Sequence, residues 1–364
     1  MWKQIRRIAN DLEEDMEVRN SSPMWMNQFL RLACVDVFGA AGLGIDLAKA
    51  DSEDRVTTKS YLKPFEVGDM VPVFLKLLQP VPKLMQNLSV IAVSKAVWGI
   101  DISRMRGLVE DRISSSNQRS GRVRKGVESF KQDHFLIDGL ITKCNGRISS
   151  RSLLRHAMTT MAACTEMVSN ELAWAIHALS RPKNQHVQDR LRQEIRTAFP
   201  LFPEDMTCED VAKVPYLIGV VNEVLRLFPN VAHRYRKCQT DTTLDGIAIK
   251  KGSLLTWPVW AMNRAPEYWG QDATELRPER WFEDQDALPR EQYAFMTFGQ
   301  GVRKCPGEHY TRAVMACTLL ALVGLFSFSM PEGGDVLADE GKKVAFGIVM
   351  RAKINAVVEV VPGW

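Results

Sequence analysis

The chain has 364 residues, of which 46% are hydrophobic and 25% are charged, a composition typical of a folded globular protein and not of a disordered one. The net charge of +4 is spread along the sequence, so no basic run predicts binding to nucleic acid. Seven cysteines without paired spacing argue against a disulfide framework and indicate a reducing compartment. The histidines are scattered and no CxxC or HExxH motif occurs, so zinc and non-haem iron sites lack ligands at usable spacing.

The amino-terminal residues 1–20 are charged and helical in pattern, and they lack the apolar core of a signal peptide or a membrane anchor. The longest apolar run, residues 313–328, is too short for a transmembrane segment and predicts a buried helix. Sequons at Asn20 and Asn87 are interpreted as chance matches, because no secretory signal accompanies them. We therefore expect no transmembrane segment in this chain.

Helical periodicity dominates the chain to about residue 230, with apolar residues at three- and four-residue spacing. Residues 243–258 instead predict short β segments with turns at Gly246 and Gly252. The predicted fold class is therefore mainly α with a small β portion. The expected helices are residues 27–39, 135–143, 153–179, 184–199 and 215–227.

Residues 61–85 form an apolar, proline-bearing stretch that contains Met70, Phe74 and Met85. Such a stretch suits a mobile lid over an apolar pocket. It suits equally a surface connection packed on the core, and both interpretations stay open.

The segment FGQGVRKCPG, residues 298–307, places a single cysteine, Cys305, in a glycine-rich turn before an apolar helix. Glycines let the backbone turn sharply and approach a flat cofactor, and nearby amides stabilise a thiolate. Arg303 can neutralise a haem carboxylate, and a thiolate ligand on haem iron favours cleavage of the O–O bond. The segment predicts a haem-iron site at Cys305; the alternative is an ordinary loop cysteine.

Glu223 and Arg226 lie three residues apart on one predicted helix, where they face the same side and can pair. Arg280 follows in a proline-bearing loop, residues 277–281, just before the cysteine segment. A buried network of these three side chains would lock the loop to the helix. Because buried charges cost desolvation, such a network is better explained by structural specificity than by stability.

In order and spacing, these three segments resemble the cytochrome P450 family. Glu223 and Arg226 match the family's ExxR helix, residues 278–281 its PERF-type segment, and residues 298–307 its haem-binding signature. The similarity is expected from about residue 27 to the carboxyl terminus. The amino-acid sequences of residues 225–229 and 269–273 resemble those of fungal members that oxidise secondary metabolites.

The resemblance implies a cytochrome P450 fold with haem b as the cofactor. It implies that Cys305 is the axial ligand, that Arg303 and Arg236 hold the haem propionates, and that Phe298 packs on the sulfur side. Gly301 is the glycine of the same signature. Two further residues, His233 and Arg234, lie with Val231 where family members line the substrate pocket, although a purely structural role for His233 is also open.

The predicted helix 153–179 resembles the helix that crosses the distal haem face, but it departs from the family pattern. Met167 stands where a threonine is usual, and a thioether cannot donate a proton. Glu166 is retained as the distal acid, and the substitute donor is either Thr165 or an ordered water. Ala163, four residues before Met167, should face the haem with it. We expect slower or altered oxygen activation.

Family members usually begin with a membrane anchor, a small β region and a helix that carries a Trp-xxx-Arg element. The resemblance therefore implies one P450 domain over residues 1–364 that lacks these amino-terminal parts. Trp2 and Arg6 copy the Trp-xxx-Arg spacing, but they lie too near residues 27–39, so the match is interpreted as coincidence. A truncated gene model, a shortened natural form and a degenerate protein all stay open.

The resemblance implies a monooxygenase that inserts one oxygen atom from O2 into a hydrophobic small molecule of fungal secondary metabolism, with NADPH–cytochrome P450 reductase as electron donor. Arg303 and Lys304 would attract an acidic reductase surface. Two alternatives stay open. One is a haem-thiolate enzyme that catalyses a rearrangement or a dehydration, and the other is a truncated, non-catalytic remnant. The expected location is cytoplasmic or peripheral to the endoplasmic reticulum.

Overall fold

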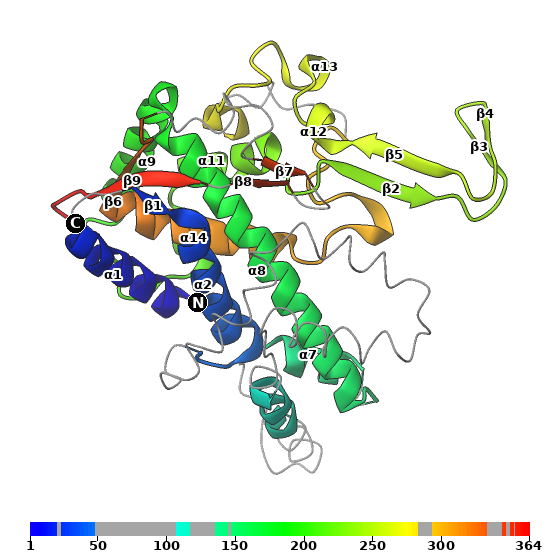
Figure 1. The fold of residues 1–364 in the computed structure, drawn as a ribbon, viewed down its shortest axis with the longest axis horizontal. Coiled ribbons are helices and arrows are strands. Elements are labelled where there is room, and N and C mark those ends of the chain that lie inside the picture. Colours follow the sequence, from blue (N-terminus) through cyan, green and yellow to red (C-terminus); the bar gives the residue numbers. More distant parts are fainter. Residues whose placement is uncertain are drawn as a thin grey trace. The chain divides into compact units, whose positions relative to one another are not determined.

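The computed structural model describes residues 1–19, 23–47, 107–116, 135–144, 147–282, 293–332, 344–346, 350–352 and 354–364 (Figure 1). These residues belong to two compact units. The first comprises Met1–Asn10 and Asn27–Ser169, and the second comprises Asp11–Met26 and Asn170–Trp364. The expectation of a single domain stays a prediction. The predicted lid, residues 61–85, lies outside the described residues, as do both sequons.

The first unit is helical. Its helices bury apolar side chains such as Ile5, Leu30 and Ile137. Arg112 donates to Asp138 at 2.8 Å and so ties the helical residues 107–116 to α7. The helices that contribute to it are α1 (Trp2–Arg19), α2 (Met26–Phe38), the π-helix η1 (Gly39–Leu43), α7 (Leu136–Lys143) and the first part of α8 (Ser150–Ser180).

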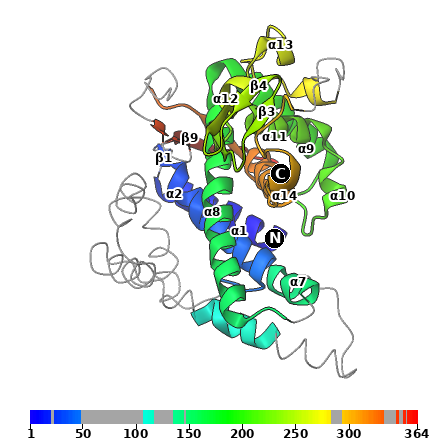
Figure 2. The ribbon, with the colours of Figure 1, turned by 90° about the vertical axis from the view of Figure 1, so that its right-hand side faces the viewer.

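The second unit is built around α9, α11 and α14, which pack side by side (Figure 2). Pro215 opens α11 at a position where its missing N–H costs nothing. Nearly every side chain of α14 from Val314 to Gly324 is buried, as expected of a helix that is apolar all round. Its helices are the end of α8, η2 (Pro182–Asn184), α9 (Gln185–Ala198), α10 (Cys208–Val211), α11 (Pro215–Leu227), α12 (Val259–Met262), α13 (Pro266–Trp269), η3 (Pro278–Trp281), η5 (Gly301–Arg303) and α14 (Glu308–Leu325).

The described strands form small antiparallel sheets. A three-stranded sheet has the order β1-β9-β6, and the other pairs are β2 with β5, β3 with β4, and β7 with β8. Asp245 and Gly246 both have positive φ, 47° and 76°, which makes the tight turn of the β3–β4 hairpin. The strands are β1 (Met24–Trp25), β2 (His233–Lys237), β3 (Thr242–Leu244), β4 (Ile247–Ile249), β5 (Leu254–Pro258), β6 (Phe326–Ser329), β7 (Val344–Phe346), β8 (Met350–Ala352) and β9 (Asn355–Val360).

The mainly α fold class with a small β portion is confirmed, and the predicted helices are present with shifts of a few residues at their ends. Two predicted boundaries between helical and β structure were wrong. The helix expected over residues 313–328 ends at Leu325, because Phe326 and Phe328 are buried in alternation with serines and form β6. The β region begins at His233, before residue 243, because β2 carries polar side chains that give no apolar alternation. No described helix has both the length and the apolarity that a membrane crossing requires.

Gly219 on α11 lies against Pro278, the first residue of η3. A Cβ at this position would lie 2.6 Å from the carbonyl oxygen of Pro278, which belongs to the backbone and cannot turn away. We therefore predict that Gly219→Ala lowers the free energy of unfolding by about 1–3 kcal/mol, although alanine has the better helix propensity.

Gly139 on α7 is the matched control, because its Cβ would have no heavy atom within 4 Å. Gly139→Ala should raise the free energy of unfolding by about 0.5–1 kcal/mol. Urea denaturation of both variants checks the pair of predictions, and equal stabilisation by both substitutions would show that α11 does not approach Pro278 so closely.

Candidate functional site

The carboxylate of Glu223 on α11 is the centre of a fully buried charged network. Arg226 donates from Nε to Glu223 Oε2 at 3.1 Å, and Arg280 donates from Nε to Oε1 at 2.7 Å. Trp281 adds a third partner, with its indole Nε1 donating to the same Oε1 at 3.0 Å. Glu223, Arg226 and Arg280 each have a relative exposure of 0%. The three residues predicted to form a network are therefore in direct contact.

The remaining donors of the two arginines bind the loop of residues 263–281. Arg226 Nη1 donates to Asn263 O at 2.8 Å and Arg226 Nη2 to Glu275 O at 3.1 Å. Arg280 Nη1 donates to Trp269 O at 3.1 Å. Burial lowers the pKa of Arg226, and the charge of Glu223 opposes that shift. Because each guanidinium is satisfied by backbone carbonyls as well as by the carboxylate, the desolvation cost of the network is offset and the loop conformation is fixed.

Asn263 connects this network to the cysteine segment. Its Nδ2 donates to Thr297 Oγ1 at 2.8 Å, and its Oδ1 accepts from the backbone N–H of Met296 at 3.2 Å. The hydroxyl of Thr297 donates in turn to Leu225 O on α11 at 2.7 Å. The residues immediately before Phe298 are therefore bonded to the same helix that carries Glu223.

The cysteine segment is a tight turn closed by its own backbone. The N–H of Cys305 donates to Phe298 O at 2.8 Å. Gly299 and Gly301 have φ of 69° and 70°, in the left-handed region that glycine tolerates without strain. A Cβ on Gly301 would meet no atom within 4 Å, so one side of the turn is open. Cys305 itself is half-buried, and Phe298 is buried behind it.

The predicted propionate ligands lie at different places around this turn. Arg303 is exposed on η5, and no ion pair joins it to a described residue. Arg236 is exposed on β2, donates to Tyr235 O at 2.9 Å and lies 5.3 Å from the ring centre of Trp257. Their roles stay predictions. His233, at the start of β2, is exposed.

Arg234 is the β2 side chain that lies against the cysteine segment. Its Nη2 donates to Thr297 O at 2.6 Å, and its guanidinium borders Gly299, where an added Cβ would lie 3.0 Å from Nη1. Its buried Nε has no hydrogen-bond partner in the described part of the chain. Burial lowers the pKa of Arg234, whereas the sulfur of Cys305 raises it. The sequence suggested a pocket position for Arg234 but gave no indication of its proximity to Cys305.

The distal residues are described within the first unit alone. On α8, Ala163 is exposed and Met167 is partly exposed, so both are accessible on one face as their spacing predicted. Glu166 is buried and forms an ion pair with Arg31 of α2 at 3.6 Å. Thr165 is fully buried, and its hydroxyl has no hydrogen-bond partner among the described residues.

Glu171 is a buried acid that the sequence reading missed. It lies on α8 in the second unit, where one carboxyl oxygen accepts from the backbone N–H of Asn230 at 3.2 Å and the other has no described partner. Burial raises the pKa of Glu171 well above its ordinary value. Its place four residues after Met167 in the sequence was the available signal.

The residues around Cys305 fit a haem-thiolate centre. A single thiol stands in a turn closed by a backbone hydrogen bond, with glycines where a side chain would obstruct a flat ligand. Two arginines, Arg234 and Arg303, have guanidinium donors that no described carboxylate binds, as the negative propionates of haem require.

Comparison with known proteins agrees with this class. The family model for cytochrome P450 matches residues 1–357, so the chain belongs to the cytochrome P450 family, whose members bind haem through a cysteine thiolate. The match begins at residue 1, earlier than the residue 27 indicated by the motifs.

Relatives include the cytochrome P450 monooxygenase sphH of Aspergillus fumigatus, 26% identical over 100% of this chain. The cytochrome P450 monooxygenase FSL4 of Gibberella zeae is 26% identical over 91% of the chain, and human cytochrome P450 3A5 is 26% identical over 86%. The chain spans 67%, 61% and 60% of the lengths of these three relatives.

Replacing Glu223 should destabilise the chain strongly, because two guanidinium groups would be left in the interior without their carboxylate. We predict a loss of about 3–5 kcal/mol for Glu223→Gln and about 1–2 kcal/mol for Trp281→Phe, which removes only the indole donor. Chemical denaturation measures both. Trp257→Phe is the control, because the Nε1 of Trp257 has no described hydrogen-bond partner; a loss as large as that of Trp281→Phe would contradict the assigned bond.

Glu171 should make stability depend on pH. Its folded-state pKa lies above the ordinary value of 4.5, so the native state retains a proton that the unfolded state releases. The contribution of Glu171 to the free energy of unfolding is therefore greatest below this ordinary value and falls as the pH rises toward the folded-state pKa, by up to about 1.4 kcal/mol per pH unit.

The variant Glu171→Gln should remove that decline when urea denaturation is compared at about pH 5 and about pH 8. Glu267→Gln, on exposed α13, should retain the wild-type dependence. An unchanged decline in Glu171→Gln would exclude Glu171 as its origin.

Proposed function

We propose that this chain is a haem-thiolate monooxygenase that inserts one oxygen atom of O2 into a hydrophobic small molecule. The observation that carries the proposal is the turn around Cys305, which presents one half-buried sulfur beside Arg234. Haem, when bound, supplies the iron at which O2 is reduced and activated. Fungal relatives named as monooxygenases support a substrate from fungal secondary metabolism.

The role of the chain on the proximal side is to hold the sulfur still and anionic. The N–H of Cys305 is engaged by Phe298 O, so the turn cannot open without losing that bond. Arg234 places a positive charge near the sulfur. Buried Phe298 keeps water from this side of the turn.

On the distal helix, proton delivery has to work without the usual threonine. Glu166 is a buried acid that forms an ion pair with Arg31, and Thr165 has a hydroxyl with no described partner. The proposal assigns proton transfer to these two groups: the hydroxyl of Thr165 donates, and the carboxylate of Glu166 accepts a proton and passes it on. Met167 contributes an apolar, accessible surface and no proton. Slower proton delivery and more uncoupled peroxide are expected.

The electron donor in the proposal is NADPH–cytochrome P450 reductase. The turn exposes Arg303 and Val302, and Lys304 lies beside them in an ion pair with Glu308 at 2.7 Å. An exposed cationic group next to an exposed apolar one suits an acidic partner surface. Location at the endoplasmic reticulum would follow from this partner and is part of the proposal.

One alternative has a specific observation in its favour. Met167 cannot donate a proton. A haem-thiolate enzyme that catalyses a rearrangement or a dehydration would not need a distal proton donor to activate O2, so Met167 is compatible with this alternative. Turnover that proceeds without NADPH and O2 would identify this alternative.

The test of the proposed function is isotope incorporation. The haem-loaded chain, reductase and NADPH should convert a hydrophobic substrate under ¹⁸O2 to a product that carries one ¹⁸O atom, and omission of NADPH should abolish the product. A product labelled only from water, or one formed without NADPH, would contradict monooxygenation.

The substitution Met167→Thr should restore a proton-donating hydroxyl. We predict that product formed per NADPH rises by about twofold or more and that peroxide release falls, measured by product yield and a peroxide assay. Met158→Thr, on the same helix outside the motif, should change neither quantity. Unchanged coupling in Met167→Thr would exclude Met167 as the cause of slow oxygen activation.

A further inference from the structure

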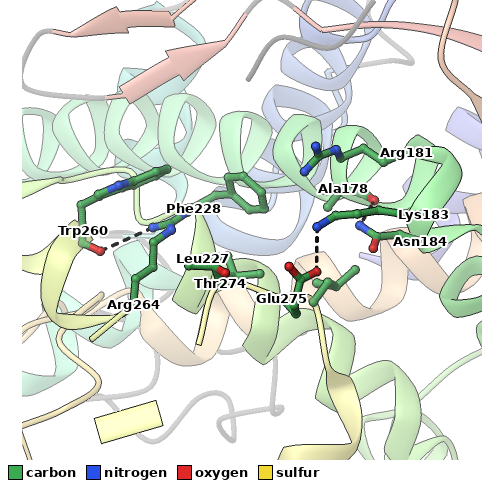
Figure 3. Close-up of a pocket in the computed structure, with 11 residues that line it drawn as sticks. Ala178, Arg181, Lys183, Asn184, Leu227, Phe228, Trp260, Arg264, Thr274 and Glu275 are labelled. Atoms are coloured by element: carbon green, nitrogen blue, oxygen red, sulfur yellow. Dashed lines mark hydrogen bonds and ion pairs between the residues drawn. The ribbon is translucent and has the colours of Figure 1, made fainter. Parts of the chain in front are cut away.

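A cavity of about 260 Å³ lies in the second unit, and its lining includes no residue of the cysteine turn (Figure 3). It is bordered by the carboxyl-terminal ends of α8 and α11, by η2, by α12 and by residues 274–276. Leu227, Phe228 and Leu276 supply apolar wall. Four of the other eight lining residues are charged, which distinguishes this cavity from an ordinary packing defect.

Arg264 is the charged residue on which the argument for a ligand depends, and it lines one end of the cavity. Its guanidinium lies over the indole of Trp260, 3.3 Å from the ring centre, and 5.7 Å from the ring centre of Phe228. Its one hydrogen bond in the described part of the chain is long, 3.5 Å from Nη1 to Trp260 O, and no described carboxylate pairs with it. The aromatic rings therefore fix the plane of the guanidinium and leave most of its N–H groups for another acceptor.

The environment of Arg264 favours binding of an anion next to its guanidinium group. Burial lowers the pKa of Arg264 to about 9, and neighbouring Arg226 adds to the shift. A buried guanidinium without an anion pays a desolvation cost that an anion would offset. The charged form is still the dominant one at neutral pH.

The opposite end of the cavity carries charged side chains as well. Arg181 and Lys183 line it, and Glu275 in the lining is bound to Lys183 at 2.6 Å. Figure 3 shows this pair at one end and Arg264 with Trp260 at the other.

We propose that this cavity is a binding site for a phosphate-type oxyanion, held by the Arg264 guanidinium with Arg181 and Lys183 supplying further positive charge. A guanidinium fork matches two oxygens of one phosphate, and the rings of Trp260 and Phe228 hold the fork in place. The anion is either free inorganic phosphate or the phosphoryl group of a small organic molecule. In the second case its organic part lies on the apolar wall.

The site is distinct from the haem centre, but it shares backbone with the Glu223 network. Glu275 lines the cavity with its side chain and accepts from Arg226 through its carbonyl. An anion on Arg264 would also neutralise the cation that repels Arg226. Binding is therefore expected to stabilise the folded chain, and it does not depend on the proposed monooxygenase activity.

Isothermal titration calorimetry of the full haem-loaded chain tests the proposal, with inorganic phosphate and phenyl phosphate as probes at an ionic strength held constant with chloride. Saturable binding of phosphate is expected, weakened by about tenfold or more in Arg264→Gln, because that variant loses a charged donor. Lys213→Gln, which removes the same charge from an exposed lysine paired with Asp210, should bind as the wild type does.

Equal affinity for the two probes would assign the site to phosphate itself, and tighter binding of phenyl phosphate would assign it to an organic phosphate. Absence of saturable binding to the folded wild type, or equal binding by Arg264→Gln, would overturn the proposal. Should Arg264→Gln fail to fold, Arg181→Gln on the partly exposed rim replaces it, with several-fold weaker binding expected and unchanged binding overturning the proposal. Titration of the haem-free chain separates a failure of this site from a failure of haem binding.

Discussion

The buried carboxylate of Glu223 is the interaction on which the rest of the second unit depends. It accepts from two guanidinium groups and one indole, all held away from water. A lone carboxylate at 0% exposure would not stay ionised, and two lone arginines could not be buried, so the three charges are stable only together. The network converts an irregular segment, residues 263–281, into a rigid part of the fold.

That rigidity reaches the reactive sulfur through a short series of bonds. Asn263, the first residue of that segment, donates a hydrogen bond to the hydroxyl of Thr297. Thr297 is in turn hydrogen-bonded to α11 and to Arg234. The turn around Cys305 begins at the next residue. The position of the sulfur therefore depends on a salt-bridge network that touches neither the sulfur nor a cofactor, and this explains why two buried charges on α11 are paired with a third, Arg280, in the segment before the cysteine turn. The cavity around Arg264 adjoins the same network from its other side.

The sequence alone predicted the features that depend on residues close together in the chain. Helix periodicity located α8, α9 and α11, and three short motifs located Glu223, Arg226, Arg280 and Cys305. What it could not predict arises from tertiary contact. Strand β2 has no apolar alternation, the proximity of Arg234 to Cys305 comes from the packing of β2 on the turn, and the raised pKa of Glu171 comes from its burial. The bond from Trp281 to Glu223 and the cavity beside Arg264 likewise join residues distant in sequence.

The central claim is that the fold presents Cys305 as the thiolate ligand of haem iron. A reduced, carbon-monoxide difference spectrum of the haem-supplemented chain tests it most directly, with Cys305→Ala and, as a matched half-buried cysteine of the same unit, Cys238→Ala. The account predicts a thiolate-type absorption band in the wild type and in Cys238→Ala, and its loss in Cys305→Ala. A band that survives in Cys305→Ala, or no band in a folded wild-type chain, would contradict it.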